Sequence, residues 1–171
     1  MSAATSTACS SRRLPVMRLL RPEIAALLPQ QDPFLFLDWA ETTESGVEGG
    51  CCFSGEEFFF KGHFKTRPVL PASILSEAAG QAAALWLARH AAARLQPGES
   101  LLPEALFVAM EEMRFRRLCL PGESIHLRLR LKRFRTPLAA FSGAAHVGDE
   151  LVAQFDALTL AFTAPPAQDA P

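Results

Sequence analysis

The sequence that decides the fold begins FFFKGHFKTRPVLP at residues 58–71 and continues ASILSEAAGQAAALWLA at residues 72–88. Alanine and leucine, which are strong helix formers, dominate the second part. We therefore predict a long helix that starts after Pro71 and continues to about Ala93. Proline suits the start of a helix, because the N–H that it lacks would find no acceptor in the first turn. Phe58–Phe60 has the composition of a strand, and we expect that strand to end just before the histidine.

Two ionisable side chains stand out in this stretch. His63 lies among phenylalanines, and Glu77 interrupts an otherwise apolar helix. A carboxyl group on a helix too apolar to be solvated all round has to be paired, neutral or functional. A packed core histidine and a solvent-facing glutamate are the simpler interpretations of each residue alone. Gln81, one turn after Glu77, is placed either to hydrogen-bond the carboxyl group or to serve a purely structural role.

The chain on both sides of this stretch alternates in a way that is typical of strands. Ile125–Phe134 puts apolar side chains on one face and charged side chains on the other. Gly49-Gly50 indicates a bulge or a turn. The expected elements outside the long helix are a short helix at Arg21–Leu28 and strands at Gly46–Ser54, Leu106–Met110, Ile125–Phe134, Leu138–Val147 and Leu151–Phe162. One long helix with several antiparallel strands predicts an α+β domain in which a curved sheet wraps a central helix.

Length and composition set the class of protein. With 171 residues, 49% of them hydrophobic, and a net charge of −1, the chain predicts one folded domain and gives no reason to propose a nucleic-acid partner. We expect this domain to span residues 15–163, with disordered ends at residues 1–14 and 164–171. No segment predicts a membrane span, and no metal-ligand spacing occurs. We interpret the four cysteines as reduced thiols of a cytoplasmic protein.

Several motifs, in the same order, resemble the 3-hydroxyacyl-[acyl carrier protein] dehydratases of the FabZ type. The resemblance runs from about Arg21 to Phe162. The segments that carry it are LPQQDPFLFLD at residues 28–38, GHF at residues 62–64, RPVLP at residues 67–71, Glu77-Ala78 with Gln81, MRFRR at residues 113–117 and PGE at residues 121–123. The family implies a hotdog fold, in which the long helix is the filling.

The resemblance implies a lyase that dehydrates a 3-hydroxyacyl thioester on an acyl carrier protein to the trans-2-enoyl thioester, with no metal or organic cofactor. It makes His63 the base and Glu77 the acid, from opposite subunits of a homodimer or a higher homo-oligomer. The chemistry of the two side chains is compatible with these roles. An imidazole suits a base near neutral pH, and a carboxyl group can act as the acid if it holds a proton. Backbone N–H groups near Ala72 would hold the thioester oxygen. The residues expected to bind substrate are Phe59, Phe60, Phe64, Pro71, Ala72 and Gln81; Phe58, Ile74 and Phe107 are further candidates for an acyl channel, with core packing as the alternative.

Four features depart from the family pattern. Lys65-Thr66 replaces Pro-Gly, Ala72 replaces glycine, Gln30-Gln31 replaces His-Arg, and the chain has no tyrosine. The acid and base are kept, so we expect dehydration in fatty-acid-like, polyketide or aryl-polyene biosynthesis. Two alternatives stay open: a hotdog thioesterase, and a non-catalytic subunit that binds acyl chains or a carrier protein. The basic residues of the C-terminal half form either a solvated strand face or a surface that attracts an acidic carrier protein: Arg114, Arg116, Arg117, Lys132, Arg133 and Arg135.

Overall fold

The computed structural model describes residues 17–163, and the ends expected to be disordered, 1–14 and 164–171, lie outside that range. All described residues belong to one sheet, its helices and their connections. In chain order the elements are β1 (Arg18–Leu20), α1 (Arg21–Leu27), β2 (Trp39–Thr43), β3 (Gly46–Cys52), the 3₁₀ helix η1 (Phe58–Gly62), α2 (Ala72–His90), η2 (Ala92–Arg94), β4 (Leu101–Glu111), β5 (Arg114–Phe115), β6 (Ser124–Arg135), β7 (Leu138–Val147) and β8 (Glu150–Thr163).

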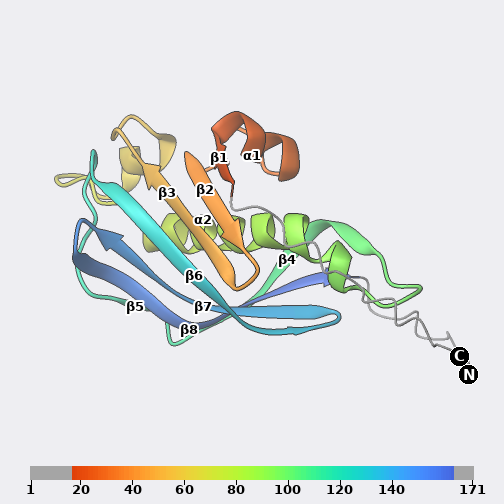
Figure 1. The fold of residues 1–171 in the computed structure, drawn as a ribbon. Coiled ribbons are helices and arrows are strands. Elements are labelled where there is room, and N and C mark those ends of the chain that lie inside the picture. Colours follow the sequence, from red (N-terminus) through yellow and green to blue (C-terminus); the bar gives the residue numbers. More distant parts are fainter. Residues whose placement is uncertain (1–16, 164–171) are drawn as a thin grey trace, which may run out of the picture.

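A single antiparallel sheet curves around α2 (Figure 1). Its strand order is β1-β2-β3-β6-β7-β8-β4, and β5 pairs with β8 beyond the end of β4. Within the described chain, β4 is therefore an edge strand with one side unpaired. This arrangement is the predicted α+β fold, with the long helix enclosed by the sheet.

The central helix is buried on almost every side because it is apolar on almost every side. Trp86 is fully buried in the concave side of the sheet, and its indole N–H donates a hydrogen bond to the carbonyl oxygen of Thr43 at 2.7 Å. Its ring packs edge-on against Phe141 of β7 and stacks on His90. Truncation of such a side chain to alanine typically costs about 3–5 kcal/mol, so this cluster fixes the helix against the sheet.

The alternation predicted for Ile125–Phe134 is confirmed in β6. Ile125, Leu127 and Leu129 are buried, whereas Arg128 and Arg130 are exposed on the opposite face. Because side chains alternate across a strand, this pattern sets which face of the sheet meets α2.

Two local predictions were wrong. Phe58–Phe60 is part of η1 and not of a strand, because its rings pack into an aromatic cluster around Phe59, whose ring centroid lies 5.4 Å from that of Phe53. Gly49-Gly50 is neither a bulge nor a turn, since both residues pair in regular register with β2. Glycine is needed at position 50 because a Cβ there would lie 2.1 Å from the indole nitrogen of Trp39. The short strand β1 was not predicted.

None of the helices within residues 17–163 combines the length and the apolar character required to cross a bilayer.

Candidate active site

His63 follows η1, and its imidazole is held by the chain that leads into α2. Its N–H donates to the carbonyl oxygen of Phe60 at 3.3 Å, and its own carbonyl oxygen accepts from the N–H of Val69 at 2.9 Å. Nδ1 lies 3.0 Å from the carbonyl oxygen of Val69. A carbonyl oxygen only accepts, so Nδ1 carries the proton in this hydrogen bond. In the neutral ring, Nε2 then keeps its lone pair and is the nitrogen that can take a proton.

The imidazole faces an apolar cavity of about 260 Å³ between η1, the start of α2 and β5. Phe64 stacks on the imidazole with ring centroids 3.9 Å apart. The lining residues are His63, Phe64, Val69, Leu70, Ala72, Leu75, Phe115, Arg117, Leu118 and Cys119. Of the residues predicted to bind substrate, the structure thus brings Phe64 and Ala72 together with His63.

The first turn of α2 presents backbone donors at this cavity. Pro71 is the N-cap and supplies no side-chain cap, while its carbonyl oxygen accepts from the N–H groups of Ile74 and Leu75. The N–H groups of Ala72 and Ser73 precede these first intrahelical bonds and have no intrahelical acceptor. They lie at the positive end of the helix dipole, where developing negative charge is stabilised. Pro71 itself is buried and does not line the cavity.

Glu77 is half-buried and is held by Gln81. The Gln81 Nε2 donates to Oε1 of Glu77 at 2.9 Å and to the carbonyl oxygen of Phe34 at 2.8 Å. The Gln81 Oε1 accepts from the N–H of Phe36 at 2.9 Å. The predicted hydrogen bond between these two side chains is therefore present. Gln81 is also structural, because it ties residues 34–36 to the helix.

His63 and Glu77 of one chain lie on different sides of α2. Ala72 and Leu75, three residues apart, both line the cavity beside His63, which defines one face of the helix. Glu77 lies two positions after Leu75, about 200° around the helix axis, and is not among the lining residues. A site that uses both side chains therefore needs a second chain.

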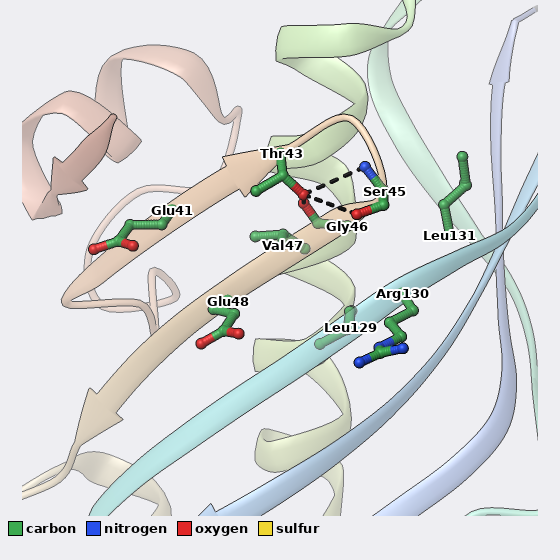
Figure 2. A pocket seen from close by; sticks show the side chains of 9 residues that line it. All are labelled: Glu41, Thr43, Ser45, Gly46, Val47, Glu48, Leu129, Arg130 and Leu131. Atoms are coloured by element: carbon green, nitrogen blue, oxygen red, sulfur yellow. Dashed lines mark hydrogen bonds between the residues drawn. The ribbon is translucent and has the colours of Figure 1, made fainter. Parts of the chain in front are cut away.

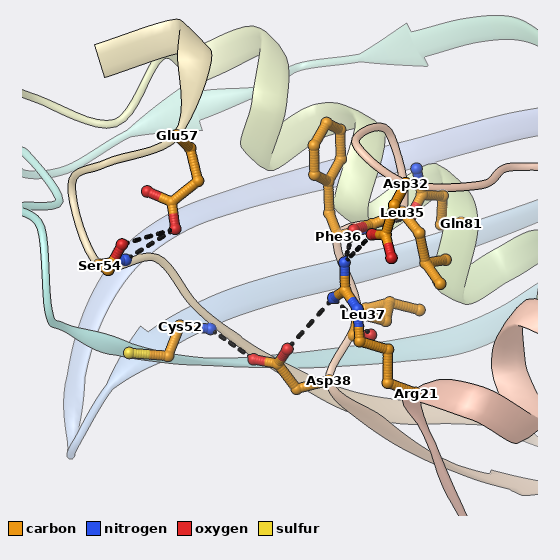
Figure 3. Close-up of polar contacts among 10 residues, drawn as sticks. All are labelled: Arg21, Asp32, Leu35, Phe36, Leu37, Asp38, Cys52, Ser54, Glu57 and Gln81. Carbon is orange, nitrogen blue, oxygen red and sulfur yellow. Dashed lines mark hydrogen bonds and ion pairs between the residues drawn. The ribbon is translucent and has the colours of Figure 1, made fainter. Parts of the chain in front are cut away.

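Phe59 and Phe60 lie away from the His63 cavity. Phe60 is buried in the core. Phe59 lines a separate hollow of about 410 Å³ with Phe36 and Phe53, whose rim is charged. Figure 3 shows part of that rim, where Arg21 binds Asp38 at 3.3 Å and the carbonyl oxygen of Leu35 at 2.7 Å. Through Leu35, Arg21 holds residues 34–36, the same segment that Gln81 ties to α2.

A larger hollow of about 660 Å³ lies over the β2–β3 hairpin and β6 (Figure 2). Its side chains include Glu41, Glu48 and Arg130, and Thr43 hydrogen-bonds Ser45 at the hairpin. None of the residues predicted from the sequence to act in catalysis or binding lines it.

Sequence reasoning missed the half of the cavity that β5 and the next loop contribute. Leu118 and Cys119 close it, and Arg117 forms ion pairs with Glu123 at 2.9 Å and Glu150 at 2.8 Å. The hydrogen bond from Arg117 holds the pKa of Glu123 below its usual value. Burial raises the pKa of Cys119, so this thiol stays protonated. The MRFRR motif was the available signal, because it places Phe115 and Arg117 near the site.

The basic residues of the C-terminal half do not form one surface. Arg114 pairs with Gln154, which pairs with Ala144, which pairs with Arg128, so these residues share one row across the sheet. Arg135 lies seven residues further along β6, about 23 Å at the usual rise of a strand. Arg114, Arg116 and Arg117 thus belong to the region of the His63 cavity, and Lys132, Arg133 and Arg135 to the other end of the sheet.

Within residues 17–163, no three His, Cys, Asp or Glu side chains lie close enough together to hold a metal ion. The three cysteines of that range, Cys51, Cys52 and Cys119, are free thiols. Cys51 is buried and Cys52 is exposed, as expected for neighbours on a strand.

A family model and curated relatives match most of this chain. A model of the FabA-like domain matches residues 28–156. The FabZ 3-hydroxyacyl-[acyl-carrier-protein] dehydratase of Chloroflexus aggregans is 33% identical over 141 residues, which cover 80% of this chain and 91% of that protein. The protein of the same name from Klebsiella pneumoniae is 34% identical over 134 residues, which cover 77% and 85%.

Solved structures share the fold. A chain of the dehydratase heterocomplex ApeI:P from Xenorhabdus doucetiae superimposes with a TM-score of 0.66 at 14% identity, over 84% of this chain and 91% of that one. The fluoroacetyl-CoA-specific thioesterase FlK superimposes with a TM-score of 0.52 at 13% identity, over 67% and 87%. At such identities the likeness concerns the fold alone. The family model matches most of this chain, and the alignments with the FabZ relatives cover most of both proteins. These matches establish that the chain belongs to the FabA-like family, together with the FabZ dehydratases.

Proposed function

We propose that this protein is a lyase that dehydrates a 3-hydroxyacyl thioester carried by an acyl carrier protein to the trans-2-enoyl thioester. The observation that carries the proposal is the hydrogen bond between Nδ1 of His63 and the carbonyl oxygen of Val69. It leaves Nε2 as a proton acceptor at an apolar cavity beside the backbone donors of α2. A base and an oxyanion site are the two groups that removal of a proton next to a thioester carbonyl requires.

In the proposed reaction, Nε2 of His63 takes the proton from the carbon next to the thioester carbonyl. The N–H groups of Ala72 and Ser73 stabilise the negative charge that develops on the thioester oxygen. The electron pair forms the carbon–carbon double bond, and the carbon–oxygen bond of the 3-hydroxyl group breaks. A protonated Glu77 of a partner subunit delivers the proton that lets this group leave as water, while Gln81 holds the carboxyl group in place.

The active unit in this proposal is a homodimer formed along β4. That strand has an unpaired edge, and it exposes three consecutive apolar side chains, Leu106, Phe107 and Val108. Exposed apolar edge strands pair readily with another chain. A second copy paired there would cover these side chains. The dimer would also supply the Glu77 that the His63 cavity lacks within one chain.

The carrier protein is expected to approach the rim of the His63 cavity. Lys65, Arg67 and Arg116 are exposed and lie close in the chain to the lining residues Phe64 and Phe115, and they would attract an acidic partner. The pathway would be fatty-acid-like, polyketide or aryl-polyene biosynthesis. A cytoplasmic location is part of the same proposal and is supported by the free thiols at Cys51, Cys52 and Cys119.

To test the proposal, the purified protein is incubated with a 3-hydroxyacyl thioester, and both the ultraviolet absorbance and the release of free thiol are measured. A dehydratase produces a conjugated enoyl thioester, which absorbs in the ultraviolet, and releases no thiol. A thioesterase releases free thiol without that absorbance. Tight binding with neither signal would assign the protein to the non-catalytic acyl-binding class and refute the proposal.

A further inference from the structure

The face of α2 that carries Glu77 continues toward the helix C-terminus as the floor of an apolar groove. Ala84 and Ala88 lie two and three turns after Glu77 on that face. A cavity of about 50 Å³ opens over them, between Leu28 on one side and Ala105 of β4 on the other. This groove is separate from the cavity of His63 and is not used by the proposed reaction.

Phe107 stands between Glu77 and this small cavity. Its ring packs on Gly80, where an added Cβ would lie 3.1 Å from two ring carbons. Gly80 is one turn after Glu77 and one turn before Ala84. On β4, Ala105 and Phe107 both face α2, since Ala105 lines the cavity over Ala84 and the Phe107 ring lies at Gly80. Phe107 therefore covers α2 at Gly80, while Ala105 lines the cavity one turn further along the helix.

We propose that Phe107 determines the length of acyl chain that the enzyme accepts, an inference that rests on the proposed function. The tail of the substrate extends past Glu77 along α2 and ends against the Phe107 ring. About 4.5 Å of helix rise separates Glu77 from Gly80, which is the span of roughly three carbon–carbon bonds. Counted from the 3-hydroxyl carbon, this space suits substrates of about six carbons.

The shape of the groove explains why one side chain has this effect. Position 80 is glycine and position 84 is alanine, and the Gln81 side chain between them is held against Glu77 and residues 34–36. Phe107 is still 45% exposed in the single chain and lies on an edge strand. Its ring is therefore the main obstacle in the groove, and its removal would join the site to the space over Ala84.

The experiment compares kcat/KM for 3-hydroxyacyl pantetheine thioesters of four, six, eight, ten and twelve carbons. In the wild type, we expect kcat/KM to fall beyond six carbons. In Phe107→Ala, the ratio of the ten-carbon to the four-carbon value should rise at least about tenfold, since a few methylene groups in an apolar pocket are worth that much. Phe107→Leu should give an intermediate rise, and it serves as the main variant if the alanine variant does not fold.

Two controls make the test specific. Leu20→Ala truncates an apolar residue that is 54% exposed on β1, at the opposite edge of the sheet from β4, so the length profile should not change. Adding Ala84→Leu to Phe107→Ala refills the cavity and should reverse the gain for ten carbons. A wild type that dehydrates no chain length refutes the proposed function. If the wild type is active and the dependence of kcat/KM on chain length is the same in both Phe107 variants, this inference is refuted and the proposed function is not.

Discussion

Nδ1 of His63 lies 3.0 Å from the carbonyl oxygen of Val69, six residues further along the chain. This contact joins the end of η1 to the segment that starts α2, so the base and the backbone donors of the helix are positioned by the same short loop. The cavity in front of the ring is lined mostly by apolar side chains, so a substrate that fills it would displace water and strengthen any electrostatic interaction formed there.

Replacement of His63 by alanine is expected to lower kcat by about 10²–10⁴-fold, the usual contribution of a general base. The free energy of unfolding should change little, because the ring is only half-buried and lies at the rim of a cavity. His126→Ala is the matched control, since His126 is also half-buried but pairs with Glu48 on the outer face of the sheet. Equal loss of turnover in both variants would contradict the assignment of the base.

A mixture of two inactive variants should regain activity if the site is shared between subunits. His63→Ala and Glu77→Gln each lack one half of every site. In a hybrid dimer of the two, one site combines the intact His63 with the intact Glu77. Random mixing by refolding or co-expression should then restore about a quarter of wild-type turnover, as follows from two-fold symmetry. No recovery in hybrids isolated with two different affinity tags would rule out a shared site.

Gln81→Leu is expected to affect both stability and catalysis. Gln81 is fully buried, and its loss leaves the carbonyl oxygen of Phe34 and the N–H of Phe36 without their partner. The free energy of unfolding should fall by about 2–4 kcal/mol, measured by urea titration. Because the Glu77 carboxyl group also loses its donor, kcat should fall more than KM rises. Gln154→Leu, at a half-buried position of β8, should leave both kinetic constants unchanged.

His90 is expected to make the protein less stable in acid. It is 2% exposed, and burial, helped by Arg94 and Arg89, lowers its pKa below the usual value. Below about pH 6.5 the unfolded chain therefore binds a proton that the folded chain does not, until the pH passes the folded-state pKa. The stabilisation is complete above about pH 6.5 and is lost as the pH falls through this interval.

The comparison for His90 is His90→Phe, which keeps a ring against Trp86 but cannot titrate. Urea unfolding of both proteins at pH 7.5 and at pH 5.5 should show a smaller loss of stability in the variant. Identical pH dependence in the two proteins would show that other groups are responsible.

Gly50→Ala is expected to destabilise β3 by about 1–3 kcal/mol, the cost of overpacking. The new Cβ would lie 2.1 Å from the Trp39 indole, which Arg18 covers on one side at 4.2 Å. Gly62→Ala is the control, because nothing lies within 4 Å of a Cβ there. The Tm of Gly50→Ala should lie several degrees below that of Gly62→Ala, and adding Trp39→Ala should relieve the effect at position 50.

The sequence was sufficient to predict the structure of a segment where one local rule decides its conformation and its burial. The mostly apolar run after Pro71 predicted a helix buried on most sides, and the alternation from Ile125 predicted a strand with one buried face. The motifs that resemble the FabZ dehydratases supplied His63 and Glu77 as the catalytic pair, and that assignment stays a prediction. The four-residue separation of Glu77 and Gln81 made their hydrogen bond one of the two roles expected for Gln81, and the structure shows both.

Local rules failed where contacts distant in sequence compete with composition. Phe58–Phe60 has the residues of a strand, yet packing against Phe53 and Phe36 makes it a 3₁₀ helix. Gly49-Gly50 has the residues of a turn, yet the Trp39 indole, on the neighbouring strand, requires glycine at position 50 within a regular ladder.

By itself, then, the sequence determined the fold class, the buried helix and the residue types available for proton transfer, because these depend on the order of apolar and polar residues along the chain. Only the tertiary structure decided which nitrogen of His63 is available, that Glu77 points away from the same chain's cavity, and that Phe107 lies on Gly80. Those relationships join residues on different elements, and their geometry is set by how the sheet closes around the helix.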